Sequence, residues 1–290
     1  MADQVVSGKE NTAFVLSGGA SLGSVQVGMA LALEEAGIEP DIIVGASVGA
    51  INGAWLASGR PVEGLAAIWR ELRRSDLFPL RPLVGLRGFA GRRSHFVPNT
   101  GLRRLLERNL DFAYLEDAAT PLTVIASDAR SGEEVALDRG PLIPALLASA
   151  AIPAVFPPVP IGDRLLIDGG IVNNTPITRA IEAGATEVWV LSPGYSCALT
   201  RPPSAAIAMG LHSVALLVQQ RLVLEITNRR YSVPVHLIPP PCPITALPTD
   251  FSQSDDLIKR GYAGTRTWLS AGRPDAMPLY PHHHEDLAAP

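Results

Sequence analysis

Short apolar runs alternate with longer amphipathic stretches along most of the chain. Short apolar runs predict buried strands, and stretches that return to an apolar residue every three or four positions predict helices. We expect strands at 13–16, 41–44, 122–127, 133–137, 165–167, 187–191 and 235–238, and helices at 24–36, 48–57, 176–183, 205–228 and 254–271. This alternation predicts an α/β fold of three layers (α/β/α), with helices on both faces of a mostly parallel central sheet.

Glycine-rich turns join strand to helix in both of the first two units. The turn at 18–23 leads into a helix that Gly37 ends, and the turn at 45–49 leads into an Ala-rich helix that stops near Gly59. In open α/β sheets, functional groups collect at the carboxyl ends of the strands. Both turns are therefore candidate functional loops.

Composition places the chain among globular proteins. The 290 residues are 47% hydrophobic and 18% charged, which supports a large core and excludes intrinsic disorder. Basic and acidic residues number 24 and 28, so the net charge of −4 gives no general attraction to nucleic acid. We expect one domain over residues 1–290, with its motifs within about 12–195, a loop-rich insertion at about 78–98 and a flexible tail at about 274–290.

Targeting, redox and metal signals are weak. Repeated prolines break the longest apolar stretch, at 141–162, which argues against a transmembrane span, and the N-terminus lacks a signal-peptide pattern, so we expect a cytoplasmic location. Cys197 and Cys242 lie 45 residues apart without a second pair, which favours neither a disulfide framework nor a zinc site. His282–His284 lie in the polar tail, and we expect no metal and no cofactor.

One region carries a strong charge imbalance. Between Arg60 and Arg108 there are eleven arginines and four acidic residues. The favoured interpretation is a solvated face of helices around Glu71 and Arg103. The alternative is a lid, or a face that makes transient contact with anionic lipid surfaces, to which each basic residue adds about 1 kcal/mol.

The segment Gly45-Ala46-Ser47-Val48-Gly49 fits the G-x-S-x-G pattern between an expected strand and an expected helix. Such a turn projects the serine hydroxyl outward, and Gly45 and Gly49 allow a backbone approach that side chains would block. Ser47 is therefore a candidate nucleophile beside a helix N-terminus, whose N–H groups favour an anion. The alternative is that Ser47 only caps this helix, a role that needs no flanking glycine.

The earlier turn, Gly18-Gly19-Ala20-Ser21-Leu22-Gly23, presents free backbone N–H groups. One interpretation is a phosphate-binding loop, but Ala20 replaces the middle glycine of G-x-G-x-x-G and no Walker lysine follows. The other is an oxyanion hole opposite Ser47, in which each donor contributes roughly 2.7–4 kcal/mol.

A serine nucleophile needs a base, and histidine is the usual one. The histidines outside the tail, none of them in a glycine- or aspartate-containing strand-end loop, are His95, His212 and His236. An apolar strand instead delivers Asp168 into the turn Gly169-Gly170. Because an ordinary Asp has a pKa near about 3.9, Asp168 would need burial beside the nucleophile to act as the base. A turn residue whose carboxylate bonds its own backbone is an equally good interpretation of these residues alone.

Taken in order, these elements resemble the patatin-like phospholipases, in their bacterial branch. The resemblance rests on the segments 18–23, 45–49 and 168–170, the last followed by Asn-Asn-Thr-Pro at 173–176, and on the apolar segment 148–158. It implies a patatin-like fold and a dyad without histidine, in which Ser47 attacks an acyl ester and Asp168 is the general base. It also implies that the glycine-rich loop supplies oxyanion donors, for which the candidates are the backbone N–H groups of Gly18, Gly19, Ala20 and Gly23.

Two residues depart from the family's commoner Gly-Gly-Gly-x-Arg/Lys-Gly form of that loop. Ala20 stands where the third glycine is usual, and Leu22 where the basic residue is usual. The lost cation makes an acyl ester a firmer expectation than a phospholipid. The leading hypothesis is a serine acyl hydrolase of lipid esters, of phospholipase A or lysophospholipase type, with 142–159 and 205–224 as candidate walls for an acyl chain.

Two other functions stay open from the sequence. The first is an α/β-hydrolase with a Ser-His-Asp triad built from Ser47, Asp168 and either His212 or His236. The second is a protein without catalytic activity that binds a nucleotide or another anion at 18–23, with Glu39 or Asp41 near the ribose.

Overall fold

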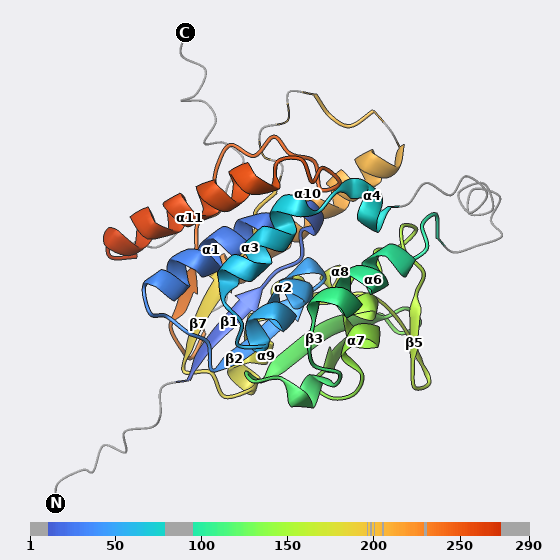
Figure 1. The fold of residues 1–290 in the computed structure, drawn as a ribbon, viewed down its shortest axis with the longest axis horizontal. Helices are drawn as coiled ribbons and strands as arrows, with labels where there is room; N and C mark the ends of the chain where they lie inside the picture. Colours follow the sequence, from blue (N-terminus) through green and yellow to red (C-terminus); the bar gives the residue numbers. More distant parts are fainter. Residues whose placement is uncertain are drawn as a thin grey trace, which may run out of the picture.

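The computed structural model describes residues 11–78, 95–195, 197, 199, 201–204, 206–228 and 231–273. Its centre is an eight-stranded sheet (Figure 1). The strands are β1 (Thr12–Leu16), β2 (Ile42–Ala46), β3 (Leu122–Asp128), β4 (Glu134–Leu137), β5 (Val159–Ile161), β6 (Arg164–Asp168), β7 (Glu187–Leu191) and β8 (Val235–Leu237). The hydrogen-bonded path is β5-β6-β3-β2-β1-β7-β8, and β4 also pairs with β3.

The sheet is mixed. Strands β3, β2, β1, β7 and β8 run parallel, whereas β4 and β6 join β3 antiparallel and β5 joins β6 antiparallel. The expected α/β fold with a central sheet between helices is confirmed. The antiparallel strands all lie at the β3 side, where short turns connect β3 to β4 and β5 to β6.

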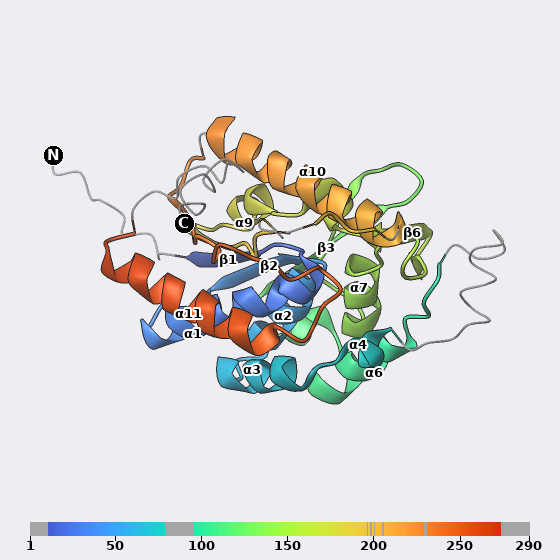
Figure 2. The same ribbon diagram turned by 90° about the horizontal axis from the view of Figure 1, so that it is seen from above.

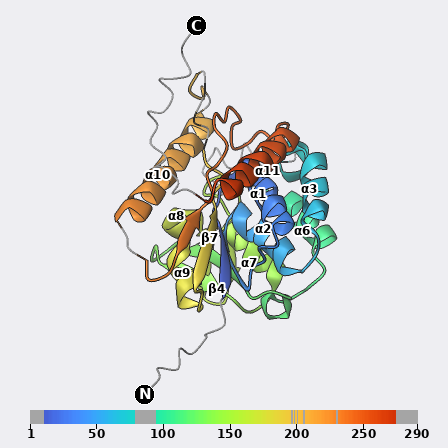
Figure 3. The ribbon, with the colours of Figure 1, turned by 90° about the vertical axis from the view of Figure 1, so that its left-hand side faces the viewer.

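Helices cover both faces of the sheet (Figures 2 and 3). In Figure 3, α8, α9 and α10 lie on one side of the strands, and α1, α2, α3, α6 and α11 lie on the other. The helices are α1 (Gly23–Glu35), α2 (Val48–Ala57), α3 (Val62–Glu71), α4 (Arg74–Leu77), α6 (Thr100–Asn109), α7 (Leu142–Ser149), α8 (Gly170–Asn173), α9 (Ile177–Glu182), α10 (Ala206–Asn228) and α11 (Ser254–Ser270).

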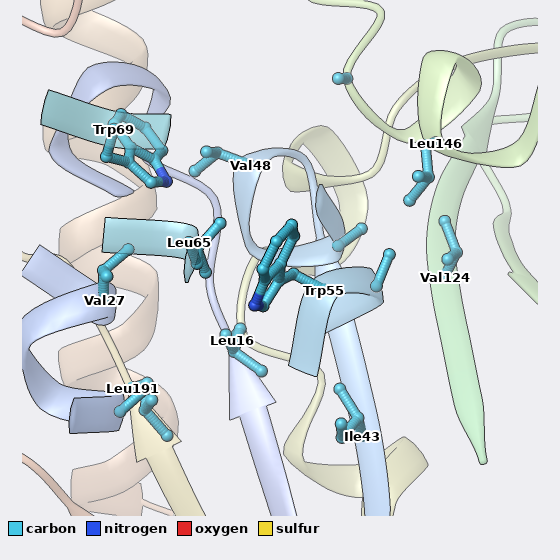
Figure 4. Packing of buried hydrophobic residues seen from close by; sticks show 14 of the residues in the cluster. Leu16, Val27, Ile43, Val48, Trp55, Leu65, Trp69, Val124, Leu146 and Leu191 are labelled. Carbon is cyan, nitrogen blue, oxygen red and sulfur yellow. The ribbon is translucent and has the colours of Figure 1, made fainter. Parts of the chain in front are cut away.

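Burial on both faces explains the apolar runs of the parallel strands. In β1, Phe14 and Leu16 belong to the larger hydrophobic cluster, whereas Ala13 and Val15 belong to a second cluster on the opposite face. Alternate side chains of a strand point to opposite faces, so a strand covered on both faces has no polar alternation. Figure 4 shows the larger cluster, where Trp55 of α2 lies among side chains from β1, β2 and α3.

Register places two strands in succession along one edge of β3. Ile125 of β3 pairs with β2 on one side and with β4 on the other, and the next residue, Ala126, pairs with β4 and with β6. Strand β2 therefore pairs with the first part of this edge of β3, and β6 pairs with the following part, beyond the end of β2. The last residue of β6, Asp168, is thereby placed beside Ser47, the residue that follows β2.

The structure adds elements that the sequence pattern did not predict, because helix α7 and strand β5 lie within the proline-rich stretch. In the arginine-rich region, α3 ends at Glu71 and α6 contains Arg103, so the helices expected around these two residues are present. Pro144 is accommodated because it lies in the first turn of α7, where backbone N–H groups have no helical acceptor. Most of the expected insertion at 78–98, and the whole tail at 274–290 with His282–His284, lie outside the described residues.

The two cysteines lie together despite their separation in sequence. Cys197 follows β7 and Cys242 follows β8, which are adjacent parallel strands, and the two Sγ atoms are 3.2 Å apart. Both are free thiols. The described residues include no group of three or more His, Cys, Asp or Glu side chains that could hold a metal ion. Every described helix is too short or too polar to cross a bilayer.

Candidate active site

Ser47 occupies the turn between β2 and α2 with φ +54° and ψ −127°. This backbone conformation is rare for a residue with a side chain, and it is retained in proteins mostly at functional turns. A Cβ at Gly49 would lie 2.1 Å from the carbonyl oxygen of Leu16, so only glycine allows α2 to start this close to β1. Ser47 is the N-cap residue of α2, but its hydroxyl makes no capping hydrogen bond, which contradicts the capping interpretation.

The Ser47 hydroxyl donates its hydrogen bond to Asp168 instead of to the backbone of α2. Ser47 Oγ donates to Asp168 Oδ2 at 2.6 Å, and both residues are buried, with 6% and 5% of their surfaces exposed. The other carboxylate oxygen, Oδ1, accepts from the N–H of Gly170 at 2.8 Å. Asp168 therefore bonds its own turn and contacts Ser47 at the same time, because each hydrogen bond involves a different oxygen.

Burial sets the acidity of this carboxyl group. Desolvation raises the pKa of Asp168 to about 6, against the opposing hydrogen bonds from Ser47 and Gly170, which stabilise the carboxylate. A carboxylate with this pKa is a stronger base than an ordinary aspartate and is still ionised at neutral pH. Asp168 is therefore buried beside Ser47, which is the condition for this carboxylate to act as a base.

Ser149, at the end of α7, connects the two strands of the site. Its hydroxyl accepts from the N–H of Ser47 at 2.8 Å and donates to the carbonyl of Ile125 at 2.5 Å, while its carbonyl accepts from the N–H of Gly169 at 3.1 Å. Ser149 thus fixes the backbone next to both Ser47 and Asp168. In the sequence, the segment that contains Ser149 contributes only to the resemblance to the family. No local pattern indicates a role for the Ser149 side chain.

The glycine-rich loop lies against Ser47, since a Cβ at Gly18 would lie 3.0 Å from the Cβ of Ser47. The N–H of Gly18 donates to Asn174 Oδ1 at 3.1 Å, and the N–H of Gly23 bonds to carbonyls of its own 3-10 turn. The N–H groups of Gly19 and Ala20 have no acceptor among the described residues. Ala20 has φ +51°, a conformation that costs a residue with a side chain about 1–3 kcal/mol.

Two pockets meet at Ser47. The first, here the α3–α6 pocket, has a volume of about 830 Å³ including its mouth and is walled by apolar side chains of α2, α3 and α6, such as Trp55, Leu65 and Leu105. The second, here the α10 pocket, has about 1380 Å³ including its mouth and is bordered by α10, by residues 152–155 and by Asp168. Ala20, Ser47, Phe78 and Ile152 line both pockets.

These pockets extend the expectation about acyl-chain walls. Ala150, Ile152 and Phe156, from the predicted wall 142–159, line the α3–α6 pocket, and the predicted wall 205–224 borders the α10 pocket. Much of the remaining wall of the α3–α6 pocket comes from apolar residues of the arginine-rich region, such as Leu65 and Leu105. The sequence signal for this wall is the helical spacing of apolar residues in α3 and α6, which is hard to see among their many arginines.

The other candidate residues lie apart from this site. His236 bonds to Glu187 Oε1 at 2.7 Å, and His212, on α10, lines neither of the two pockets at Ser47. The Ser47 hydroxyl bonds directly to Asp168. Asp41 immediately precedes β2 and accepts from the N–H of Thr12, at the opposite end of the strand from Ser47. Neither arrangement favours the histidine triad or the nucleotide site.

Known proteins share this arrangement of sequence and fold. A family model for patatin-like phospholipase matches residues 14–181. A protein of Mycobacterium tuberculosis named as an NTE family protein is 32% identical over 176 residues, 59% of this chain and 46% of that protein. Patatin-like phospholipase domain-containing protein 6 of Homo sapiens is 29% identical over 184 residues, 63% of this chain and 13% of that protein. The matches thus span less than half the length of these relatives.

A solved structure agrees in fold. The crystal structure of VipD from Legionella pneumophila has a TM-score of 0.53 with this chain at 16% identity, and the superposition covers 91% of this chain and 67% of that chain. The family match at 14–181 spans more than half of this chain and includes the glycine-rich loop, Ser47 and Asp168. The chain belongs to the patatin-like phospholipase family.

Proposed function

We propose that this protein is a serine acyl hydrolase that cleaves lipid esters, with Ser47 as nucleophile and Asp168 as general base. The observation that carries the proposal is the 2.6 Å hydrogen bond from Ser47 Oγ to Asp168 Oδ2. A nucleophile and its base must lie within hydrogen-bond distance, and here the proton already points at the group that takes it. The apolar α3–α6 pocket that opens at Ser47 suits the acyl chain of a lipid.

The reaction takes two steps. Ser47 Oγ attacks the ester carbonyl carbon while its proton passes to Asp168, and the carbonyl oxygen becomes an oxyanion. The bond to the alcohol oxygen then breaks, and that oxygen leaves with the proton from Asp168, so an acyl serine remains. Asp168 next takes a proton from water, the water oxygen attacks the acyl carbon, and the fatty acid departs as the proton returns to Ser47 Oγ.

The N–H groups of Gly19 and Ala20 are the donors that we assign to the oxyanion. They are the N–H groups of the loop that find no acceptor in the part of the chain that the structure describes, whereas those of Gly18 and Gly23 are engaged within the protein. The N-terminus of α2 adds its positive dipole end beside Ser47. Fixed donors at this place stabilise charge that exists only in the transition state.

We expect a fluorophosphonate probe to label Ser47, and the labelling rate to follow the ionisation of Asp168. Because the pKa of Asp168 is raised to about 6, the base is protonated below that pH. The second-order labelling rate should therefore rise about tenfold per pH unit up to pH 6 and be level above it. Peptide mapping by mass spectrometry identifies the labelled residue, and circular dichroism at each pH confirms the fold. Labelling of another residue, or a rate independent of pH between 4 and 8, would contradict the proposal.

We expect the α3–α6 pocket to set the preference for acyl-chain length. Leu105 lines this pocket from α6 and is only partly buried, so Leu105→Trp should fill the pocket without disrupting the core. Overpacking costs about 1–3 kcal/mol, so the rate ratio of p-nitrophenyl palmitate over butyrate should fall by about 5- to 150-fold.

The matched control is Arg104→Trp, one position away on the exposed face of α6. It adds the same side chain outside the pocket, so its chain-length ratio should equal that of the parent protein. An unchanged ratio in Leu105→Trp would show that the acyl chain binds elsewhere.

We also propose that the arginine-rich region makes transient contact with anionic lipid surfaces. Arg73, Arg74 and Arg108 are exposed and make no ion pair with a described residue. Other arginines have partners within the protein, since Arg70 pairs with Glu63 and Asp255. The predicted cytoplasmic location stays a prediction from the sequence.

A further inference from the structure

The α10 pocket contains a buried hydrogen-bond donor without a partner. Gln219 lines this pocket from α10 with 5% of its surface exposed, and its Nε2 has no acceptor among the described residues. Leaving a buried amide donor unsatisfied is costly, and such groups in native proteins usually await a ligand or water. The pocket also has a cation at its wall, because Arg74 of α4 lines it and forms no ion pair within the described part of the chain.

The α3–α6 pocket has the opposite chemistry. Its indole N–H groups are already engaged, since Trp55 donates to the carbonyl of Pro61 and Trp69 donates to Asn52 Oδ1. Asn109, at its far wall, likewise donates its amide to the carbonyl of Leu105. With these polar groups satisfied internally, this pocket offers a hydrocarbon surface and suits an acyl chain.

An ester bound for attack by Ser47 extends away from its carbonyl in two directions, toward the acyl chain and toward the alcohol. Ser47 lies where the two pockets meet, so each half of the ester has its own pocket. The half that carries oxygen atoms and charge needs donors and a cation, and the α10 pocket is the one that provides them.

We propose that the α10 pocket holds the alcohol half of the substrate, and that Gln219 and Arg74 select an alcohol that bears a phosphate. Gln219 Nε2 donates to an oxygen of that alcohol half, and the Arg74 guanidinium pairs with the phosphate charge. Arg74 thus supplies from α4 the cation that Leu22 does not supply in the glycine-rich loop. This assignment rests on the proposed hydrolase function of the same site.

The test compares two probes with the same acyl chain, palmitoyl lysophosphatidylglycerol and ethyl palmitate, in one nonionic detergent. The measured quantity is the ratio of their kcat/KM values. We expect Gln219→Met to lower this ratio about tenfold, the effect of one buried hydrogen bond, and Arg74→Gln to lower it by a similar factor. Gln220→Met, the neighbouring exposed residue on the same helix, should leave the ratio unchanged.

Thermal unfolding separates recognition from damage to the fold. Because Gln219 Nε2 has no partner to lose, Gln219→Met should keep the Tm of the parent protein or raise it. An unchanged ratio in Gln219→Met would overturn the assignment of the alcohol half to the α10 pocket. An unchanged ratio in Arg74→Gln would overturn the selection of a phosphate by Arg74. Full activity of Ser47→Ala on both probes would instead overturn the hydrolase proposal itself, so the two failures are distinguishable.

Discussion

Replacing Ser47 with alanine is expected to lower kcat for ester hydrolysis at least about 10⁴-fold. The variant keeps the pockets and the N–H groups of Gly19 and Ala20, but it has no oxygen to form the acyl enzyme. Water activated by Asp168 is the remaining nucleophile, and it is not held at the position of Ser47 Oγ. Hydrolysis of a p-nitrophenyl ester and of a lysophospholipid measures the loss.

A second serine of the same helix provides the control. Ser58 lies at the other end of α2, where its hydroxyl donates to the carbonyl of Trp55. Ser58→Ala therefore tests the loss of a hydroxyl from α2 without touching the dyad, and its activity should match the parent protein. If Ser47→Ala kept more than about a hundredth of the parent kcat, the nucleophile would have to be another residue.

Asp168→Asn is expected to remove activity by about 10³- to 10⁴-fold and, at the same time, to stabilise the protein at alkaline pH. Asparagine has nearly the same shape as aspartate, but it cannot accept the Ser47 proton. Loss of the general base therefore lowers kcat although the backbone of the site is retained. The same p-nitrophenyl ester assay, at pH 8, measures this effect.

The stabilising effect follows from the raised pKa of Asp168. In the folded protein the pKa is about 6, whereas an aspartate in the unfolded chain titrates near about 3.9, so the folded state favours the protonated form. Its contribution to the free energy of unfolding is fully present below the unfolded pKa and is lost as pH rises through 6. At pH 8 this loss is about 3 kcal/mol, and the asparagine variant does not suffer it.

Urea unfolding at pH 4 and at pH 8 measures this difference. We expect Asp168→Asn to unfold at a higher urea concentration than the parent protein at pH 8, and the advantage to shrink at pH 4. Asp128→Asn should behave oppositely at pH 8, because the N–H groups of Arg130 and Ser131 hold the pKa of Asp128 below its usual range. An asparagine variant of Asp168 that lost stability at pH 8 would contradict the desolvated carboxylate described here.

Local pattern predicted most of the parallel sheet. The strand at Glu187–Leu191 and the helix at Val48–Ala57 have the expected bounds, since each is an apolar run with clear polar or glycine limits. Strand β5 was missed because it is short and lies among prolines. Helix α7 was missed because prolines interrupt the apolar stretch at 141–162, although a proline in the first turn of a helix removes no hydrogen bond.

The site shows where local pattern stops being informative. Glycines on both sides of Ser47 marked it as a candidate nucleophile, because a backbone turn has local requirements. The residues alone left Asp168 open between base and turn, and only the resemblance paired it with Ser47. The role of Ser149 depends on a hydroxyl that reaches a backbone 102 residues away, which no local pattern encodes.

Strands β2 and β6 pair with successive parts of one edge of β3, so ester hydrolysis reports whether both strands have joined the sheet. Ser47 and Asp168 are 121 residues apart in sequence, and the two side chains meet only when both β2 and β6 pair with β3 in register. Helical content can return during refolding from local contacts alone, whereas such a long-range pairing cannot. Recovery of esterase activity therefore reports the closure of the last long-range contacts, independently of the spectroscopic recovery of secondary structure.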